Sequence, residues 1–435
     1  MSVINYLTSN IFKQPSLFLG VVALIGLLLQ RKSFGEVIKG TFKTIIGVII
    51  LFKGVNIIGD AVSPLSGAFS TLYDLPASNQ FDPQGWLNFL GEYGSTIGLV
   101  IVLAFIINLL VARITPIKNI FLTGHIFFWM SYIFVAVGVE AGLTGTALTI
   151  FATLFLALYI IVVPALLRPF VKKVTGSDDF TIGHSASIFC LLGAGIGKLV
   201  GNKEKSTEDL KIPKAFEFFR DTTIATSLIV FATYIVVGLI IGPDARVEIF
   251  GGAIGTLNTI GGMQYDLFTF SLMAGLTFGA GLTILLTGVR LMLGEIIPAF
   301  KGISDKLIPN SIPALDIPMV FPFAPNALLI GFIVSMVTSI LTIVIMASTG
   351  LLAYAVIPLT VACFFDVAPG AIFANATGGR RGAVIASIVS GVLMVLLVAV
   401  SIPALFNTVA GFNQLFGGND FSLWSAIGSL IGKIF

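Results

Sequence analysis

Residues Ile120–Val139 read Ile-Phe-Leu-Thr-Gly-His-Ile-Phe-Phe-Trp-Met-Ser-Tyr-Ile-Phe-Val-Ala-Val-Gly-Val. The run is long enough for a membrane-spanning helix, and His125 is the one basic side chain within it. A polar side chain inside a membrane is unfavourable unless it has a purpose, so His125 is a candidate functional residue. The stretch therefore predicts a membrane helix that carries a site residue near one end.

The composition of the whole chain agrees with a membrane protein. Of its 435 residues, 56% are hydrophobic and 10% are charged, whereas a soluble domain carries about 25% charged residues. The apolar runs have the length of helices rather than of barrel strands, so we expect an all-α integral membrane protein. The net charge of +3 is too small to indicate a nucleic-acid partner.

The positions of Lys and Arg predict the topology, because cytoplasmic loops are enriched in basic residues. Residues 182–200 lie between two basic clusters, so we expect a re-entrant hairpin there, with an interfacial helix as the alternative. Residues 198–220 mix both charge signs and are expected to form a cytoplasmic loop, and residues 368–381 a second loop or hairpin. About eleven spans are expected, at 16–29, 44–59, 95–111, 120–139, 147–167, 222–241, 267–293, 326–347, 351–365, 383–405 and 421–435.

Two segments resemble each other at a constant offset, which indicates an internal repeat. The charge pattern predicts that the first segment runs outward and the second inward, as an inverted repeat requires. We therefore expect a single membrane domain over residues 1–435, with repeat one at about 31–200 and repeat two at about 265–407. The identical pairs are Gly47/Gly281, Ile50/Ile284, Leu51/Leu285, Gly54/Gly288, Val55/Val289 and Pro64/Pro298.

Three polar residues in apolar sequence are candidate functional residues. His125 follows Thr123-Gly124, His184 ends Phe180-Thr-Ile-Gly-His184, and Asp316 lies in Ile312-Pro-Ala-Leu-Asp316. Imidazole can donate and accept hydrogen bonds and a carboxylate accepts them, which suits a ligand rich in hydroxyl groups. The simpler alternatives are a histidine joining two helices, a histidine facing cytoplasmic water and a helix N-cap. The three positions are too far apart in sequence for a local metal motif, so we expect no metal.

Other chemical motifs are sparse. The sequence contains no Walker A motif or nucleophile elbow, so we expect no cofactor and no catalytic nucleophile. Arg290 and Glu295 lie near the inner end of a span and are expected to be paired or to reach the membrane surface. Arg380-Arg381 is expected to anchor the cytoplasmic side or to contact an anionic group.

Several motifs resemble one known family, in the same order along nearly the whole chain. They are Leu122–Ile126, Phe180–His184, Glu208–Pro213, Leu315-Asp316 with Phe323–Asn326, Phe300–Ser304, Leu307–Pro309 and Phe373–Asn375. This set is similar to the ascorbate-type IIC permease component of the bacterial phosphotransferase system, within the ascorbate/galactitol superfamily. The resemblance implies a multi-pass homodimer in the bacterial inner membrane, with a core domain, a scaffold domain and an elevator-like movement. It also implies a substrate that is phosphorylated by a separate IIB protein, and IIB in turn receives its phosphoryl group from IIA.

The resemblance also assigns candidate substrate-binding residues. The family's substrate contacts fall on His125, His184 and Asp316, and we add Thr123 and Asn326 from the matching motifs. The family pattern has Gln four residues after the first histidine and directly after the second, where this chain has Trp129 and Ser185. We therefore include these two residues as candidates, with L-ascorbate as the first expected substrate and another sugar acid, a sugar or a polyol as alternatives.

Three functions from different classes are consistent with these features. The first is a IIC permease that presents a small hydroxylated substrate to IIB. The second is an ion-coupled secondary transporter in which a histidine or Asp316 carries protons. The third is a membrane-embedded enzyme, which ranks behind the others because the sequence offers no nucleophile or metal cluster.

Overall fold

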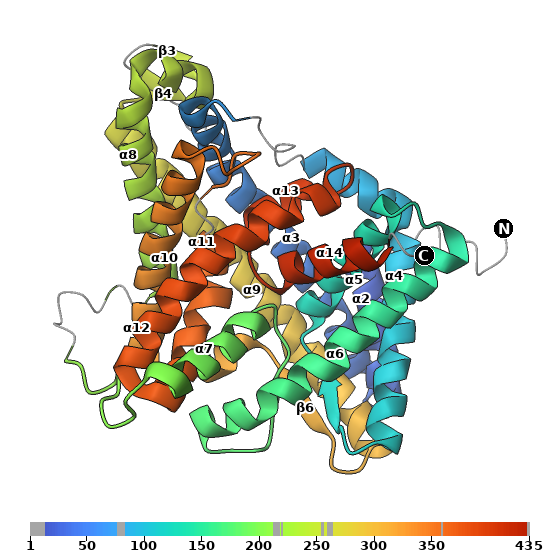
Figure 1. Ribbon diagram of the computed structural model, residues 1–435. Helices are drawn as coiled ribbons and strands as arrows, with labels where there is room; N and C mark the ends of the chain where they lie inside the picture. Colours follow the sequence, from blue (N-terminus) through green and yellow to red (C-terminus); the bar gives the residue numbers. More distant parts are fainter. Residues whose placement is uncertain are drawn as a thin grey trace.

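The structure is built mostly from helices. A computed structural model describes residues 14–75, 83–211, 218, 221–253, 256–258, 264–357 and 360–432 (Figure 1). The first residues, part of the 198–220 loop and the end of the 421–435 span lie outside the described residues. The α-helices are α2 (Pro15–Leu29), α3 (Phe34–Tyr73), α4 (Pro83–Ile114), α5 (Gly124–Glu140), α6 (Gly145–Thr175), α7 (Ser187–Val200), α8 (Thr222–Phe250), α9 (Leu267–Leu307), α10 (Pro325–Ser348), α11 (Thr360–Ala362), α12 (Ala368–Ser401), α13 (Ala410–Phe416) and α14 (Asp420–Gly432).

Seven helices among the described residues are long and apolar enough to cross a membrane. They are α3, α4, α6, α8, α9, α10 and a run that joins a π-helical turn to α12. The sequence-based count of eleven is higher because it included short helices such as α2 and α14. Helix α5, which carries the opening stretch, is also apolar but has only 17 residues.

Some expected boundaries are wrong. Helix α3 continues well beyond the expected end at residue 59, because Ala61, Val62, Leu65 and Ala68 keep one buried face at helical spacing. The residues after the expected end of this span are thus helical up to Tyr73. The expected spans 44–59 and 95–111 are therefore parts of longer helices.

The region from 351 to 381 also differs from the expectation. Residues 351–357 are not helical although several are buried, and the helical run begins at Thr360. It passes through the π-helical turn η4 (Cys363–Val367) directly into α12. The expected loop at 368–381 is therefore helix, interrupted at Gly379, whose φ of 62° is readily adopted only by glycine. An alanine Cβ at Gly379 would overlap the carbonyl oxygens of Asn202 and Lys205, so this break lets the loop after α7 approach α12.

Two small sheets correct the expectation of an all-α protein. One is antiparallel and joins β3 (Gly252–Ala253), β4 (Thr256–Asn258) and β5 (Gln264–Tyr265), between the expected spans 222–241 and 267–293. The other is parallel, in the order β1 (Asn119–Phe121), β6 (Ile312–Leu315), β2 (Thr181–Ile182). Its register pairs Phe121 with Ala314 and Ile182 with Leu315, so all three strands end at the same edge.

Helices α3 and α9 pack closely through small residues. A Cβ added at Gly47 or Gly54 would meet the backbone of Gly288 or Gly281, respectively. A Cβ at Gly288 would likewise meet the backbone of Gly47, and one at Gly281 would meet Ile57 and Ile58. Small residues allow two membrane helices to approach until their backbones touch. The four glycines are those paired in the expected repeat, and they lie across from one another in the helix contact. The repeat itself stays a prediction.

Candidate functional site

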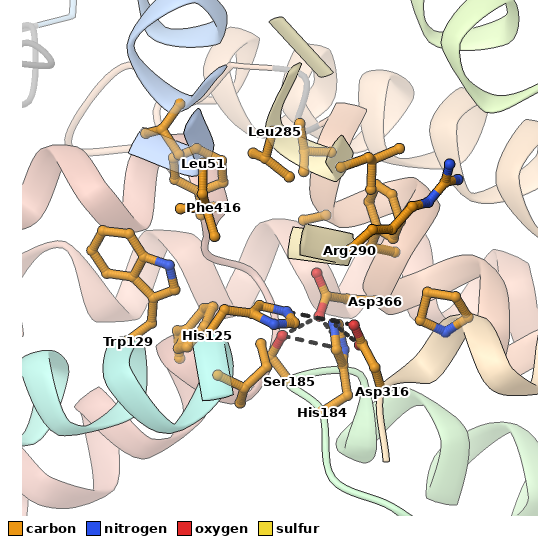
Figure 2. Close-up of a pocket in the computed structure, with 18 of the residues that line it drawn as sticks. Leu51, His125, Trp129, His184, Ser185, Leu285, Arg290, Asp316, Asp366 and Phe416 are labelled. Atoms are coloured by element: carbon orange, nitrogen blue, oxygen red, sulfur yellow. Dashed lines mark hydrogen bonds and ion pairs between the residues drawn. The ribbon is translucent and has the colours of Figure 1, made fainter. Parts of the chain in front are cut away.

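The parallel sheet brings together the three polar residues singled out in the sequence. Asp316 directly follows β6, His184 is two residues beyond β2, and His125 is four residues beyond β1. Because parallel strands end at the same edge, their following residues converge, as they do in ligand sites of other parallel sheets. His184 Nε2 lies 3.6 Å from Asp316 Oδ1, and His125 Nε2 lies 4.0 Å from Asp316 Oδ2 (Figure 2).

Helix N-termini surround the same point. His125 is in the first turn of α5, α7 begins three residues after His184, and Asp316 is the N-cap of the 3₁₀ helix η3 (Ile317–Phe323). Asp316 Oδ1 accepts a hydrogen bond of 2.8 Å from the backbone N–H of Ile317. The N-terminus of a helix carries partial positive charge, so this surrounding favours a carboxylate and electron-rich ligand oxygens.

The hydrogen bonds of His184 define its tautomer. Its Nδ1 accepts from the backbone N–H of Ala186 at 3.1 Å, so the proton of the neutral ring lies on Nε2. Nε2 lies 3.6 Å from Asp316 Oδ1, and the side chain of His184 is 6% exposed. The neutral ring therefore has its proton on the nitrogen nearer to Asp316.

His125 is less restrained than His184. Its Nδ1 is buried and has no hydrogen-bond partner among the described residues. Its ring centroid is 5.9 Å from that of His184, in an edge-to-face arrangement. A buried imidazole nitrogen without a partner is costly unless a ligand or water supplies one, which is typical of a binding residue.

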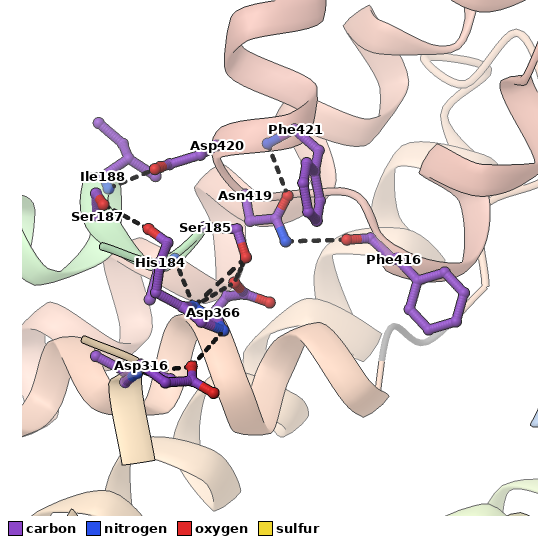
Figure 3. A network of polar contacts seen from close by, with 12 residues as sticks. His184, Ser185, Ser187, Ile188, Asp316, Asp366, Phe416, Asn419, Asp420 and Phe421 are labelled. Carbon is purple, nitrogen blue, oxygen red and sulfur yellow. Dashed lines mark hydrogen bonds and ion pairs between the residues drawn. The ribbon is translucent and has the colours of Figure 1, made fainter. Parts of the chain in front are cut away.

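Asp366 is a site residue that the sequence reasoning missed. It lies on η4, and its Oδ1 accepts a hydrogen bond of 2.5 Å from Ser185 Oγ and is 3.5 Å from His184 Nδ1 (Figures 2 and 3). The signal in the sequence was a carboxylate directly after Phe364-Phe365. Because the expected span ended at residue 365, Asp366 was placed at the membrane surface, where a charged side chain is not unfavourable.

A second buried carboxylate holds the backbone around His184. Asp420 Oδ1 accepts from the backbone N–H of Ile188 at 2.9 Å, near the start of α7 (Figure 3). Its Oδ2 accepts from the hydroxyl of Tyr159 at 2.9 Å, and that hydroxyl is 3.1 Å from the carbonyl of His184. The backbone N–H of Asp420 also donates to the carbonyl of Ser185. These contacts tie α6, the His184 turn and α14 together, so Asp420 and Tyr159 act as positioning residues.

Ion pairs attach the loop that leads to β2 to the end of α6. Arg168 Nε and Lys172 Nζ, at the end of α6, lie 2.8 and 3.4 Å from the carboxylate of Asp178. The hydrogen bond from Arg168, with the charges of both basic residues, lowers the pKa of Asp178. The pairs are about half exposed, so they contribute little to stability.

The polar cluster forms one wall of a cavity of about 390 Å³. This volume lies in the range of small-molecule sites. The facing wall comes from α3 and α9 and is apolar except for Arg290, whose guanidinium points away from the two carboxylates in Figure 2. Arg290 therefore lines the cavity. Glu295, expected to be paired or to reach the membrane surface, forms an ion pair with Lys43 at 3.0 Å. The lining residues are Leu51, Val55, His125, Ile126, Trp129, His184, Ser185, Leu285, Leu286, Arg290, Leu315, Asp316, Pro318, Met319, Phe321, Val361, Ala362, Phe365, Asp366, Phe412, Phe416 and Phe421.

Trp129 lines the cavity one helical turn after His125. Its ring lies 4.9 Å from that of Phe412 and 5.7 Å from that of Phe52, between centroids. The indole is 7% exposed, so it fills the space at one end of the cavity with a large apolar surface. Trp129 thus limits the size of a ligand beside His125.

Two of the predicted site residues do not reach the cavity wall. Thr123 is 1% exposed and is the N-cap residue of α5 without a side-chain cap bond. Asn326 Nδ2 donates to the carbonyls of Thr207 and Leu210, and its backbone N–H donates to Glu208. Asn326 therefore attaches the loop after α7 to the start of α10 rather than facing a ligand.

The three strand-end residues could also hold a metal ion. One ligand atom from each of His125, His184 and Asp316 lies within 4.8 Å of the others. Two imidazoles and a carboxylate are ligands that zinc accepts. The expectation of no metal stays a prediction.

Helices that can span a membrane, arranged around a cavity with one polar wall, are typical of a multi-pass membrane protein of the transport type. Residues 10–420 match the family described as the PTS system sugar-specific permease component, EIIC-GAT. The chain therefore belongs to this family of multi-pass phosphotransferase-system permeases. An ascorbate-specific PTS system EIIC component of Mycoplasma pneumoniae is 28% identical over 473 residues, covering 97% of this chain and 70% of that protein. The family assignment confirms the resemblance found in the sequence.

Proposed function

We propose that the chain binds a small polyhydroxylated substrate in the cavity and presents it to a separate IIB protein for phosphorylation. The observation that carries this proposal is the convergence of His125, His184 and Asp316 at three parallel strand ends. These groups offer N–H donors and carboxylate acceptors at close spacing, as adjacent hydroxyl groups of a sugar require. L-Ascorbate is the candidate that the name of a relative suggests, and another sugar acid, a sugar or a polyol are the alternatives.

The substrate would move with the polar wall. Strands β1, β2 and β6 are joined by backbone hydrogen bonds, so the residues that follow them would shift as one body. The opposite wall from α3 and α9 offers mostly aliphatic side chains, over which polar groups can slide without exchanging partners. We therefore propose that α3 and α9 belong to a scaffold domain that also forms the homodimer. The elements bearing the site would form a core domain that moves like an elevator in the bacterial inner membrane.

One geometric feature favours a second function. His184 lies between two carboxylates, 3.6 Å from Asp316 and 3.5 Å from Asp366, an arrangement that could pass protons. An ion-coupled transporter would use it that way.

Uptake into inverted and right-side-out vesicles separates these functions. We expect a phosphorylated product that appears only with IIB, IIA and the phosphoryl donor. Uptake that is independent of IIB and is abolished by a protonophore would refute the phosphotransferase function and support the ion-coupled transporter.

A further inference from the structure

The second carboxylate in the cavity narrows the class of substrate, and this inference rests on the permease function proposed above. Asp366 lines the cavity beside His184, at the ring nitrogen opposite the one that faces Asp316. We propose that Asp366 selects uncharged sugars or polyols and disfavours sugar acids such as the ascorbate anion.

The hydrogen-bond capacity of the site supports an uncharged ligand. Asp366 uses Oδ1 for Ser185, and an ionised carboxylate can accept at about four lone-pair positions, so acceptor capacity remains. Asp316 adds a second acceptor on the other side of His184. Each hydroxyl of a polyol can donate to a carboxylate and accept from an imidazole N–H, whereas an acid group offers only acceptors.

The charges in the cavity wall point the same way. The charged or titratable lining residues are two carboxylates, two imidazoles and one guanidinium. The guanidinium of Arg290 points away from Asp316 and Asp366, so it does not neutralise them (Figure 2). An anionic ligand would bring its charge within a few ångströms of these carboxylates. In a partly buried site, this repulsion lowers the affinity for the ligand by about tenfold or more.

The hydroxyl of Ser185 adds to the argument. Ser185 also lines the cavity, but its hydroxyl donates to Asp366 and is therefore not free to donate to an anionic oxygen of a ligand. The same hydrogen bond holds the Asp366 carboxylate in the cavity wall.

Binding measured by calorimetry on the purified full-length protein tests this proposal. The probes are pentitols and hexitols, each beside the aldonate with the same carbon skeleton, and L-ascorbate. Each ratio of affinities compares an uncharged ligand with its anionic counterpart in one protein sample, so a partly inactive preparation does not change it. We expect the uncharged member of the best-bound pair to bind at least about tenfold more tightly.

Two substitutions assign the preference to Asp366. Asp366→Asn keeps the shape and an acceptor oxygen but removes the charge, and Asp366→Ser removes the carboxylate altogether. We expect either variant to reduce the ratio by about tenfold, mainly by strengthening binding of the anion. The matched control is Asp178→Asn, which removes an exposed carboxylate outside the cavity and should leave the ratio unchanged.

The outcomes separate this inference from the permease function. Tighter binding of the anion by the native protein, or an unchanged ratio in both Asp366 variants, overturns the inference and leaves IIB-dependent phosphorylation intact. Binding of no probe, together with the absence of an IIB-dependent product, overturns the permease function as well.

Discussion

Replacing Asp316 with Asn tests the centre of the site. The variant should still fold, because an amide oxygen can accept the 2.8 Å hydrogen bond from the backbone N–H of Ile317. It loses the charge that faces Nε2 of His184 at 3.6 Å and Nε2 of His125 at 4.0 Å. A hydrogen bond to a charged group contributes about 1.5–3 kcal/mol and one to a neutral group about 0.5–1.5 kcal/mol, so the change should cost about 1–1.5 kcal/mol of binding free energy.

That loss corresponds to a five- to tenfold weaker affinity, roughly, for the tightest-binding probe of the ligand panel. Asp316→Ala removes the acceptor entirely and should weaken binding further, by about a factor of ten beyond Asn. Calorimetry on monodisperse protein measures both, with Asp178→Asn as the control for loss of a surface carboxylate. An affinity of Asp316→Asn within about twofold of the native value would remove Asp316 from the ligand contacts.

Three further changes test the framework of the site. Gly288→Val would push a side chain into the backbone of α3 and should destabilise the protein by about 1–3 kcal/mol, which a lower melting temperature would show. The control is Gly294→Ala on the same helix, whose added Cβ meets nothing within 4 Å and should leave the melting temperature unchanged. Tyr159→Phe leaves buried Asp420 without one donor and should lower stability by about 1–3 kcal/mol, and an unchanged thermal midpoint would contradict that role. Glu208→Ala removes the acceptor for two N–H groups at the start of α10, at 3.1 and 2.9 Å, and should cost about 1 kcal/mol while amides of the loop after α7 exchange faster.

The sequence identified three residues that cluster in the structure, but it did not predict the elements that bring them together. The rule that polar residues are rare inside membranes was sufficient to select His125, His184 and Asp316. The structure places all three in one cluster. The strands that align them have two to four residues each, too short for a periodic pattern to reveal, so the sheet could not be predicted.

Misplaced boundaries account for the residues that were missed. The run 351–365 was interpreted as a span, which put Asp366 at a membrane surface, but the chain there is non-helical and then enters a π-helical turn. Residues 368–381 were expected to form a loop or hairpin, although α12 continues through them with only a local break at Gly379. The position of Asn326 in a family motif could not show whether its side chain contacts a ligand or another part of the protein. In the structure, the side chain donates to two carbonyls of the loop after α7.

The order of strands in the parallel sheet has a consequence for biogenesis. The central strand, β6, is the last of the three in the sequence, and both β1 and β2 pair with it rather than with each other. While the ribosome is still synthesising the chain before Ile312, the two outer strands have no central partner, and the histidines that follow them have no Asp316. The cluster of His125, His184 and Asp316 is therefore completed late, only after α9 has been made and β6 has paired with the two outer strands. A nascent chain arrested before residue 312 should be inserted in the membrane and yet be unable to hold substrate.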